Sequence, residues 1–255
     1  MALQIGRAFQ DGIDELLSER GALFAGAFIV YGLLSSVVWA SLSRAFTELF
    51  LEQLPNEAQV SQAAMAASNP LALDIPLAVA AVGALVLYVV SEALNIVAIR
   101  AFASGDRDPI PDDVSRRLGK TVAVTIAAAI LTGIATAIGF ILLIIPGIVL
   151  AVLFFFVRQE IALNDSGILE SISNSIGLVS DNLLTTAVLA IVLVVIGLVV
   201  GFVFQALPLP LPALALTTIT TAVSGIVTVF SIAVTTVAYL QVTEPEYGAD
   251  TVAGL

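Results

Sequence analysis

Charged residues are very unevenly distributed along the chain, and two long stretches carry none. Residues 182–243 contain no Asp, Glu, Lys or Arg, and only the segment LPLPLP at 207–212 interrupts their apolar run. Residues 121–157 form a second charge-free stretch. The apolar core of a bilayer, about 30 Å thick, is crossed by about twenty helical residues, so each stretch is too long for one ordinary span. The sequence therefore predicts an integral membrane protein with several spans.

The fold class that this pattern predicts is all-α: a single membrane domain, residues 1–242, built as a bundle of about six transmembrane helices and followed by an acidic tail at 243–255. The predicted spans are about 22–42, 76–98, 121–145, 148–162, 183–207 and 213–242. Pro146-Gly147 marks the break between the third and fourth spans, because proline cannot continue a helix and glycine turns freely. Five spans remain an alternative if this region is a re-entrant kink.

Two further segments have the periodicity of amphipathic helices that lie on the cytoplasmic side of the membrane. Residues 1–20 and 167–180 place apolar side chains on one helical face and polar ones on the other. Asp165 or Ser166 is the expected cap of the second helix. The sequences IGRAFQDGIDELL, VSRRLGKTVAV and ISNSIGLVSDNLL each precede an apolar hairpin. They are either three copies of an internal repeat or apolar segments that are alike in composition only.

The basic residues predict the orientation. With the N-terminus inside, Arg44 is the only basic residue on the outer side, in a predicted loop at 43–75, and the positive-inside rule favours this arrangement. We therefore expect a cell-membrane protein with both termini in the cytoplasm. The N-terminal segment holds acidic residues and no unbroken apolar core, so we expect no cleavable signal.

Composition narrows the class of protein. Hydrophobic residues make up 59% and charged residues 11%, against about 25% charged residues in a soluble domain. The membrane domain uses up the chain, and no room remains for a soluble catalytic domain. The net charge of −11 and a single lysine, Lys120, are typical of a salt-loving microbe, an archaeon. The acidic balance also argues against a nucleic-acid partner.

Catalytic chemistry has little support in the sequence. Without Cys or His there are no disulfides, no thiolate or imidazole metal ligands and no His base. The motifs HExxH, GxSxG, GxGxxG and the P-loop are absent. A Ser–Lys dyad at Lys120 is disfavoured because this residue lies at the membrane edge. We expect no enzyme, no cofactor and no metal, and as partners membrane lipids and other membrane proteins.

Glu92 is the only charged residue in the body of a predicted span. It lies about eight residues before Arg100 and thus about 12 Å deep. With Ser91 and Asn95 it forms a candidate intramembrane polar site. One interpretation is a proton or cation site. The other, which we favour because no second acid, His or Lys completes a relay, is a neutral or Arg-paired carboxyl that helps to join neighbouring helices.

Four basic residues are candidate contacts for lipid headgroups: Arg158, Arg116, Arg117 and Lys120. Arg158 stands near the end of a short span, where a long side chain reaches the headgroups. The other three form a small cluster for which a topology signal is the simpler explanation.

Small and hydroxyl side chains in the last two predicted spans have two interpretations. The abundant Thr of 213–242 lines a polar pore or, as we favour, bonds its own helix backbone and packs between helices. Gly197, Gly201 and Gly225 fit close helix packing.

Residues 141–182, ILLIIPGIVLAVLFFFVRQEIALNDSGILESISNSIGLVSDN, resemble the membrane domain of glycerophosphodiester phosphodiesterases and its stand-alone relatives, uncharacterised membrane proteins that include archaeal ones. The residues that carry the resemblance are Pro146, Gly147, Arg158, Asp165, Gly167 and Ser175. The chain departs from the pattern in lacking a Pro after the Arg and basic residues in the next helix. The resemblance implies a multi-span helical bundle. It implies no phosphodiesterase activity, which belongs to a soluble barrel that this chain lacks.

Two functions follow as hypotheses. The first is a non-enzymatic membrane protein with an accessory, scaffold or lipid-interacting role. The alternative is a small-molecule or ion transporter that uses Glu92. A water-filled cavity beside Glu92 at mid-membrane would favour transport, and a dry bundle with Glu92 bonded to a neighbour would favour the scaffold.

Overall fold

The computed structural model of the chain describes residues 3–51, 71–104, 110–206 and 211–244. The fold of these residues is all-α, and six helices are long and apolar enough to cross a membrane, which confirms the predicted fold class. Most of the predicted loop at 43–75, part of the LPLPLP turn and nearly all of the acidic tail lie outside the described residues.

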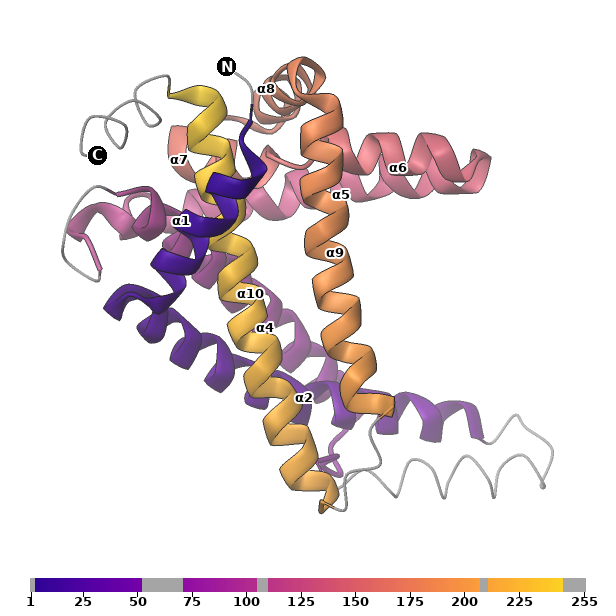
Figure 1. Cartoon of the computed structure of the whole chain (residues 1–255). Helices are drawn as coiled ribbons and strands as arrows, with labels where there is room; N and C mark the ends of the chain where they lie inside the picture. The colour runs from indigo at the N-terminus through magenta and orange to yellow at the C-terminus, as the bar shows by residue number, and fades with distance from the viewer. Residues whose placement is uncertain (1–2, 52–70, 105–109, 207–210, 245–255) are drawn as a thin grey trace.

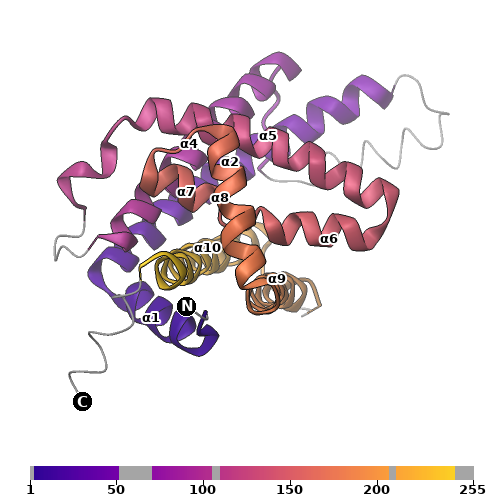
Figure 2. The same ribbon diagram turned by 90° about the horizontal axis from the view of Figure 1, so that it is seen from above.

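The helices in chain order are α1 (Ile5–Leu17), α2 (Glu19–Leu51), α4 (Leu77–Ala103), the 3₁₀ helix η1 (Asp112–Ser115), α5 (Leu118–Leu142), α6 (Ile144–Leu153), α7 (Val157–Asn164), α8 (Ile168–Asp181), α9 (Leu183–Ala206) and α10 (Ala213–Thr243). Helices α7 and α8 lie toward the end of the molecule where α1 begins and α10 ends (Figure 1). Seen from above, α9 and α10 are viewed nearly end-on, whereas α5 and α6 lie across the view (Figure 2). The hairpin of α5 and α6 therefore runs across the direction of α9 and α10.

The interpretation as three repeats fits the structure in two places. Helix α1 precedes the pair α2 and α4, and α8 precedes the pair α9 and α10. The segment VSRRLGKTVAV forms no separate surface helix, because it comprises the end of η1 and the start of α5.

Two span boundaries differ from the prediction. Helix α2 continues to Leu51, so residues 43–51 are helical rather than loop; an ion pair one turn apart, Arg44 Nε to Glu48 Oε1 at 2.8 Å, supports this extension. The chain turns at Leu143, where φ is −161° and ψ is 147°, and not at Pro146. Proline is tolerated in the first turn of α6, because the first N–H groups of a helix have no partner within it.

The predicted fourth span, 148–162, is not one continuous helix. Helix α6 ends at Leu153, and α7 begins at Val157. The hydroxyl of Ser175, in α8, donates to the Leu153 carbonyl at 2.8 Å and accepts from the Phe156 amide at 3.2 Å. Ser175 therefore satisfies two backbone groups that the interruption frees.

The start of α8 also differs from the prediction, because Gly167 is the N-cap rather than Asp165 or Ser166. The Glu170 carboxylate accepts from the Gly167 amide at 3.2 Å. Asp165 has a left-handed backbone, with φ of 53°, and its carboxylate instead pairs with an arginine. Ser166 donates to Glu160 at 3.4 Å.

Helix α10 is the most buried of the candidate spans and packs against α1, α2, α4 and α9. Gly225 lets α10 approach α2 closely, since a Cβ there would lie 3.1 Å from the backbone nitrogen of Ile29. Among the residues that the structure describes, no atom of another element lies within 4 Å of a Cβ at Gly197 or Gly201. Close packing was thus the right prediction for Gly225 and the wrong one for the pair in α9.

Candidate functional site

Glu92 is bonded across to another helix. It is 3% exposed, and its Oε1 accepts from Arg158 Nη2 of α7 at 3.0 Å. Glu92 Oε2 and Arg158 Nε are buried without a hydrogen-bond partner among the described residues. The Arg158 side chain is nevertheless 42% exposed. The pair is therefore joined by one hydrogen bond and leaves part of the guanidinium open.

The other two members of the predicted polar site bond each other rather than Glu92. Asn95 Nδ2 donates to the Ser91 carbonyl of its own helix at 2.8 Å. Both side chains border a cavity, whereas Glu92 lines neither of the two cavities described below. Of the interpretations that the sequence left open, the structure has the Arg-paired carboxyl, with Arg158 as the link between helices.

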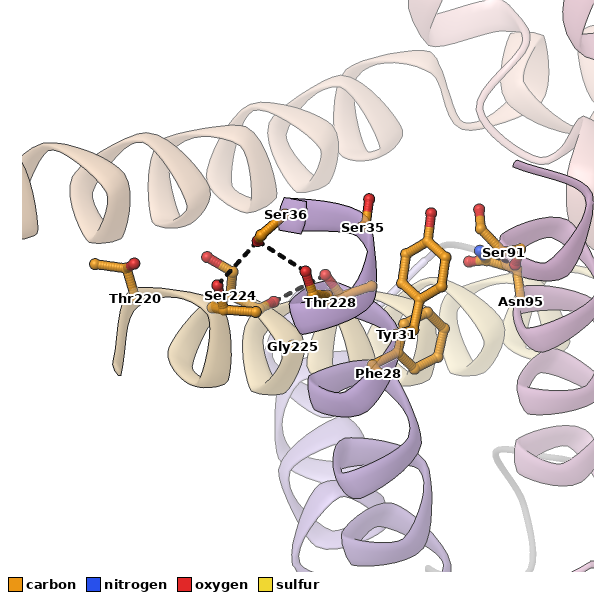
Figure 3. Close-up of a pocket in the computed structure, with 12 residues that line it drawn as sticks. Phe28, Tyr31, Ser35, Ser36, Ser91, Asn95, Thr220, Ser224, Gly225 and Thr228 are labelled. Carbon is orange, nitrogen blue, oxygen red and sulfur yellow. Dashed lines mark hydrogen bonds between the residues drawn. The ribbon is translucent and has the colours of Figure 1, made fainter. Parts of the chain in front are cut away.

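The first cavity, about 380 Å³, lies between α2, α4 and α10 (Figure 3). Most of the residues that line it carry a hydroxyl or an amide; the full lining comprises Phe28, Tyr31, Gly32, Ser35, Ser36, Ser91, Asn95, Thr220, Thr221, Ser224, Gly225 and Thr228. A lining of this kind is uncommon inside a membrane domain, where polar side chains normally face a partner or water.

Three hydroxyl groups of this cavity donate to the backbone and so offer lone pairs to the cavity. Thr228 donates to the Ser224 carbonyl at 2.8 Å, Thr220 to the Thr217 carbonyl at 3.0 Å, and Ser36 to the Gly32 carbonyl at 2.8 Å. A hydroxyl that gives its proton to the helix backbone keeps its lone pairs free. Backbone bonding by Thr, the use that the sequence favoured, is therefore compatible with a polar wall.

The second cavity, about 340 Å³, lies between α4, α7, α9 and α10. It is lined by Asn95, Ile99, Phe155, Arg158, Gln159, Leu193, Gly197, Val227, Thr228, Ser231, Ile232 and Thr235. Asn95 and Thr228 border both cavities, so the two adjoin. Gln159 is 5% exposed, and its Oε1 has no hydrogen-bond partner among the described residues.

One face of α10 connects the two cavities. Its hydroxyl side chains recur at helical spacing, at Thr220, Ser224, Thr228, Ser231 and Thr235. The first and last are separated by about 22 Å at about 1.5 Å per residue. This polar face covers most of an apolar bilayer core about 30 Å thick.

A polar cluster around Arg100 fixes the C-terminal end of α4, and the sequence analysis did not predict it. The buried Arg100 guanidinium donates to the carbonyls of Ala162, Val114 and Arg116, to the Thr121 hydroxyl, and to the Asp165 carboxylate at 3.0 Å. These acceptors join α4 to the chain around η1, α5 and α7. The only sequence signal was a basic residue at the end of a span, which topology alone explained.

Glu160 centres a second such cluster. It is 3% exposed, and its Oε1 accepts from the Tyr239 hydroxyl of α10 at 2.9 Å. Its Oε2 accepts from Asn164, Ser166 and Asn174. A hint was present in the small polar residues that surround the α7–α8 turn.

The basic cluster at the start of α5 divides into two parts. Arg116 contributes to the Arg100 cluster, with its Nε 3.3 Å from Asp165 Oδ2 and its Nη2 donating to the Leu163 carbonyl at 3.2 Å. Arg117, with a left-handed φ of 47°, and Lys120 are exposed. Within the described part of the chain, no group of three or more acidic residues could hold a metal ion.

Comparison with known proteins places the chain in a family. No curated protein and no solved structure matches it. A family model described as "Domain of unknown function (DUF7847)" matches residues 3–242. This description names no phosphodiesterase membrane domain, so that resemblance stays a prediction. Since the match covers nearly the whole chain, this multi-span helical protein belongs to the DUF7847 family.

Proposed function

We propose that the chain is a non-enzymatic membrane protein that gives a small polar solute a path through the membrane along α10. The observation that carries this proposal is the adjoining pair of cavities on the hydroxyl face of α10. Polar side chains at membrane depth commonly line water-filled cavities or substrate paths. In the proposal, Asn95 and Thr228 contact the solute where the two cavities meet.

Glu92 has a different role here from the one that the transporter hypothesis first gave it. It lines neither cavity, and its carboxylate holds Arg158. Glu92 therefore positions the guanidinium beside the path instead of carrying a proton or cation along it.

An accessory, scaffold or lipid-interacting role is the second candidate, and one observation favours it. Glu92 is bonded to a neighbouring helix, as expected of an acid that joins helices. The exposed Arg117 and Lys120 are available for lipid headgroups in this role.

Permeation into vesicles separates the two candidates without a known substrate. Proteoliposomes would be mixed with polyols, sugars and amino acids, and their reswelling followed by light scattering. We expect at least one solute to enter faster than into protein-free vesicles, and Thr228→Val to slow it. Thr218→Val is the matched control, because Thr218 lies on the same helix, also bonds its own backbone and is exposed. Equal rates with and without protein would leave the accessory role.

We also propose that both termini face the cytoplasm. Basic residues cluster near the ends of α4 and α5, and the positive-inside rule places these ends inside. Single cysteines can be introduced into this Cys-free chain and labelled with an impermeant reagent. Asp74→Cys should label from outside, and Asp112→Cys and Ser180→Cys only after the membrane is opened. Labelling of Ser180→Cys from outside would contradict the proposal.

An origin in a salt-loving archaeon is a further proposal, supported by the net charge of −11. High salt screens the repulsion between acidic groups. The purified protein should unfold at a higher temperature in molar KCl than in dilute buffer, and an unchanged unfolding temperature would count against this origin.

A further inference from the structure

We infer that the second cavity is an anion site, in which Arg158 binds a carboxylate or phosphate group. The inference deepens the proposed function, on which it rests for the claim that this anion belongs to the transported solute. The binding site itself stands on the geometry of α4, α7 and α10.

Arg158 lies deep in the predicted membrane, beside Glu92. Its partner Glu92 lies about 12 Å below Arg100 along α4. Arg158 is 42% exposed even though it bonds Glu92 at that depth. An open guanidinium below the headgroups is costly unless water or an anion meets it. The cavity beside Arg158 is the place where such a group would stand.

The second cavity has hydrogen-bond donors besides Arg158. Asn95 uses one amide N–H on the Ser91 carbonyl and keeps the other. Gln159 adds an amide that is 5% exposed. The hydroxyls of Ser231 and Thr235 are committed to backbone carbonyls at 2.8 and 2.7 Å. Arginine with two amides is a donor set that suits anionic oxygens, to which an arginine bonds strongly.

The remaining lining residues limit the size and kind of the anion. Phe155, Leu193 and Gly197 give the cavity an apolar side toward α9. Its volume of about 340 Å³ is near the lower limit of ligand pockets, which span about 300–1,000 Å³. A small organic acid or the phosphate group of a lipid fits this combination of arginine, amides and apolar wall.

The effect of neutralising Glu92 on anion affinity distinguishes an anion site from a purely structural ion pair. An anion at Arg158 shares the guanidinium with the Glu92 carboxylate, and the two negative charges repel. Neutralising Glu92 should therefore strengthen anion binding. If Arg158 and Glu92 only hold α4 to α7, replacing either one should weaken whatever the protein binds.

Calorimetric titration of the full chain in neutral detergent tests the site. The probes are sodium phosphate, sodium lactate, and mixed micelles containing phosphatidylglycerol. Arg158→Gln should weaken binding about tenfold or more, as expected for lost charge-assisted hydrogen bonds. Glu92→Gln should tighten it by about tenfold. Arg44→Gln is the control of equal charge, since Arg44 belongs to an ion pair remote from the cavity, and should leave binding unchanged.

The outcomes are decisive in both directions. Binding of phosphate or lactate identifies a free anion, and a response to phosphatidylglycerol alone identifies a lipid headgroup; either supports the site if Glu92→Gln tightens it. This arm holds even if Arg158→Gln does not fold. Absence of binding to every probe, or weaker binding by Glu92→Gln, overturns the site. Permeation of neutral polyols without anion binding would contradict the anion site but not the solute path along α10. Anion binding without permeation would contradict the solute path but not the anion site.

Discussion

Two arginines that the structure places within candidate spans are held in very different ways. Arg100 donates to three backbone carbonyls, a hydroxyl and the Asp165 carboxylate, and its side chain is 5% exposed. Arg158 has one carboxylate partner and is 42% exposed. A buried charge is tolerated when its hydrogen bonds are complete. Arg100 therefore stabilises the fold, whereas the Arg158 guanidinium can still donate hydrogen bonds to a further partner.

The largest expected effect is that of Arg100→Leu. It removes the donor that the carbonyls of Ala162, Val114 and Arg116 share, and it leaves Asp165 with Arg116 as its remaining arginine partner. Breaking a buried pair in this way costs about 3–5 kcal/mol of the free energy of unfolding. Unfolding of the purified protein in mixed micelles should show this loss, and a clearly smaller one for Arg158→Leu. Equal losses would remove the distinction between the two arginines.

Tyr239→Phe extends the test to the neighbouring Glu160 cluster. The variant keeps the ring but removes the hydroxyl that donates to Glu160 at 2.9 Å. A hydrogen bond to a charged group contributes about 1.5–3 kcal/mol, so we expect a loss in that range in the same assay. Tyr88→Phe, on an exposed side chain of α4, is the control. A variant as stable as the wild type would show that Asn164, Asn174 and Ser166 hold Glu160 without the tyrosine.

Ser175→Ala should have a smaller effect at the same end of the molecule. It leaves the Leu153 carbonyl and the Phe156 amide without the hydroxyl that now serves both. The expected loss is about 1–2 kcal/mol. Ser180→Ala, at an exposed position of the same helix, should change the stability by about 0.5 kcal/mol or less. If the two variants behave alike, the interruption between α6 and α7 needs no side-chain support.

Glu92→Gln should change the stability least of the four variants, and it tests the pair that Glu92 forms with Arg158. The amide keeps the size of the side chain and an oxygen that accepts from Arg158, so stability should change by about 1 kcal/mol or less. Glu92→Leu should cost more, because Arg158 then loses its acceptor. A loss for Glu92→Gln as large as that for Arg100→Leu would assign both arginines to the fold.

The sequence predicted the parts of the fold that depend on apolar length alone. Long charge-free stretches indicate spans, but the turn at Leu143 depends on how α5 and α6 meet, and Pro146 is compatible with the first turn of a helix. At the site, the sequence showed that Glu92 needs a partner. It could not indicate that the partner is 66 residues away. Arg100 was missed because most of its acceptors are backbone carbonyls, which leave no pattern in the side chains.

The Glu160 cluster has a consequence for biosynthesis. Tyr239 follows Glu160 by 79 residues and belongs to α10, which leaves the ribosome after the other helices that the structure describes. Until α10 has been inserted, the Glu160 carboxylate lacks the hydrogen bond from Tyr239, and neither cavity has its α10 wall. A nascent chain that stops before Tyr239 thus presents an incompletely bonded acid in the membrane. Ribosome-bound intermediates of increasing length should become resistant to protease only once this tyrosine is included.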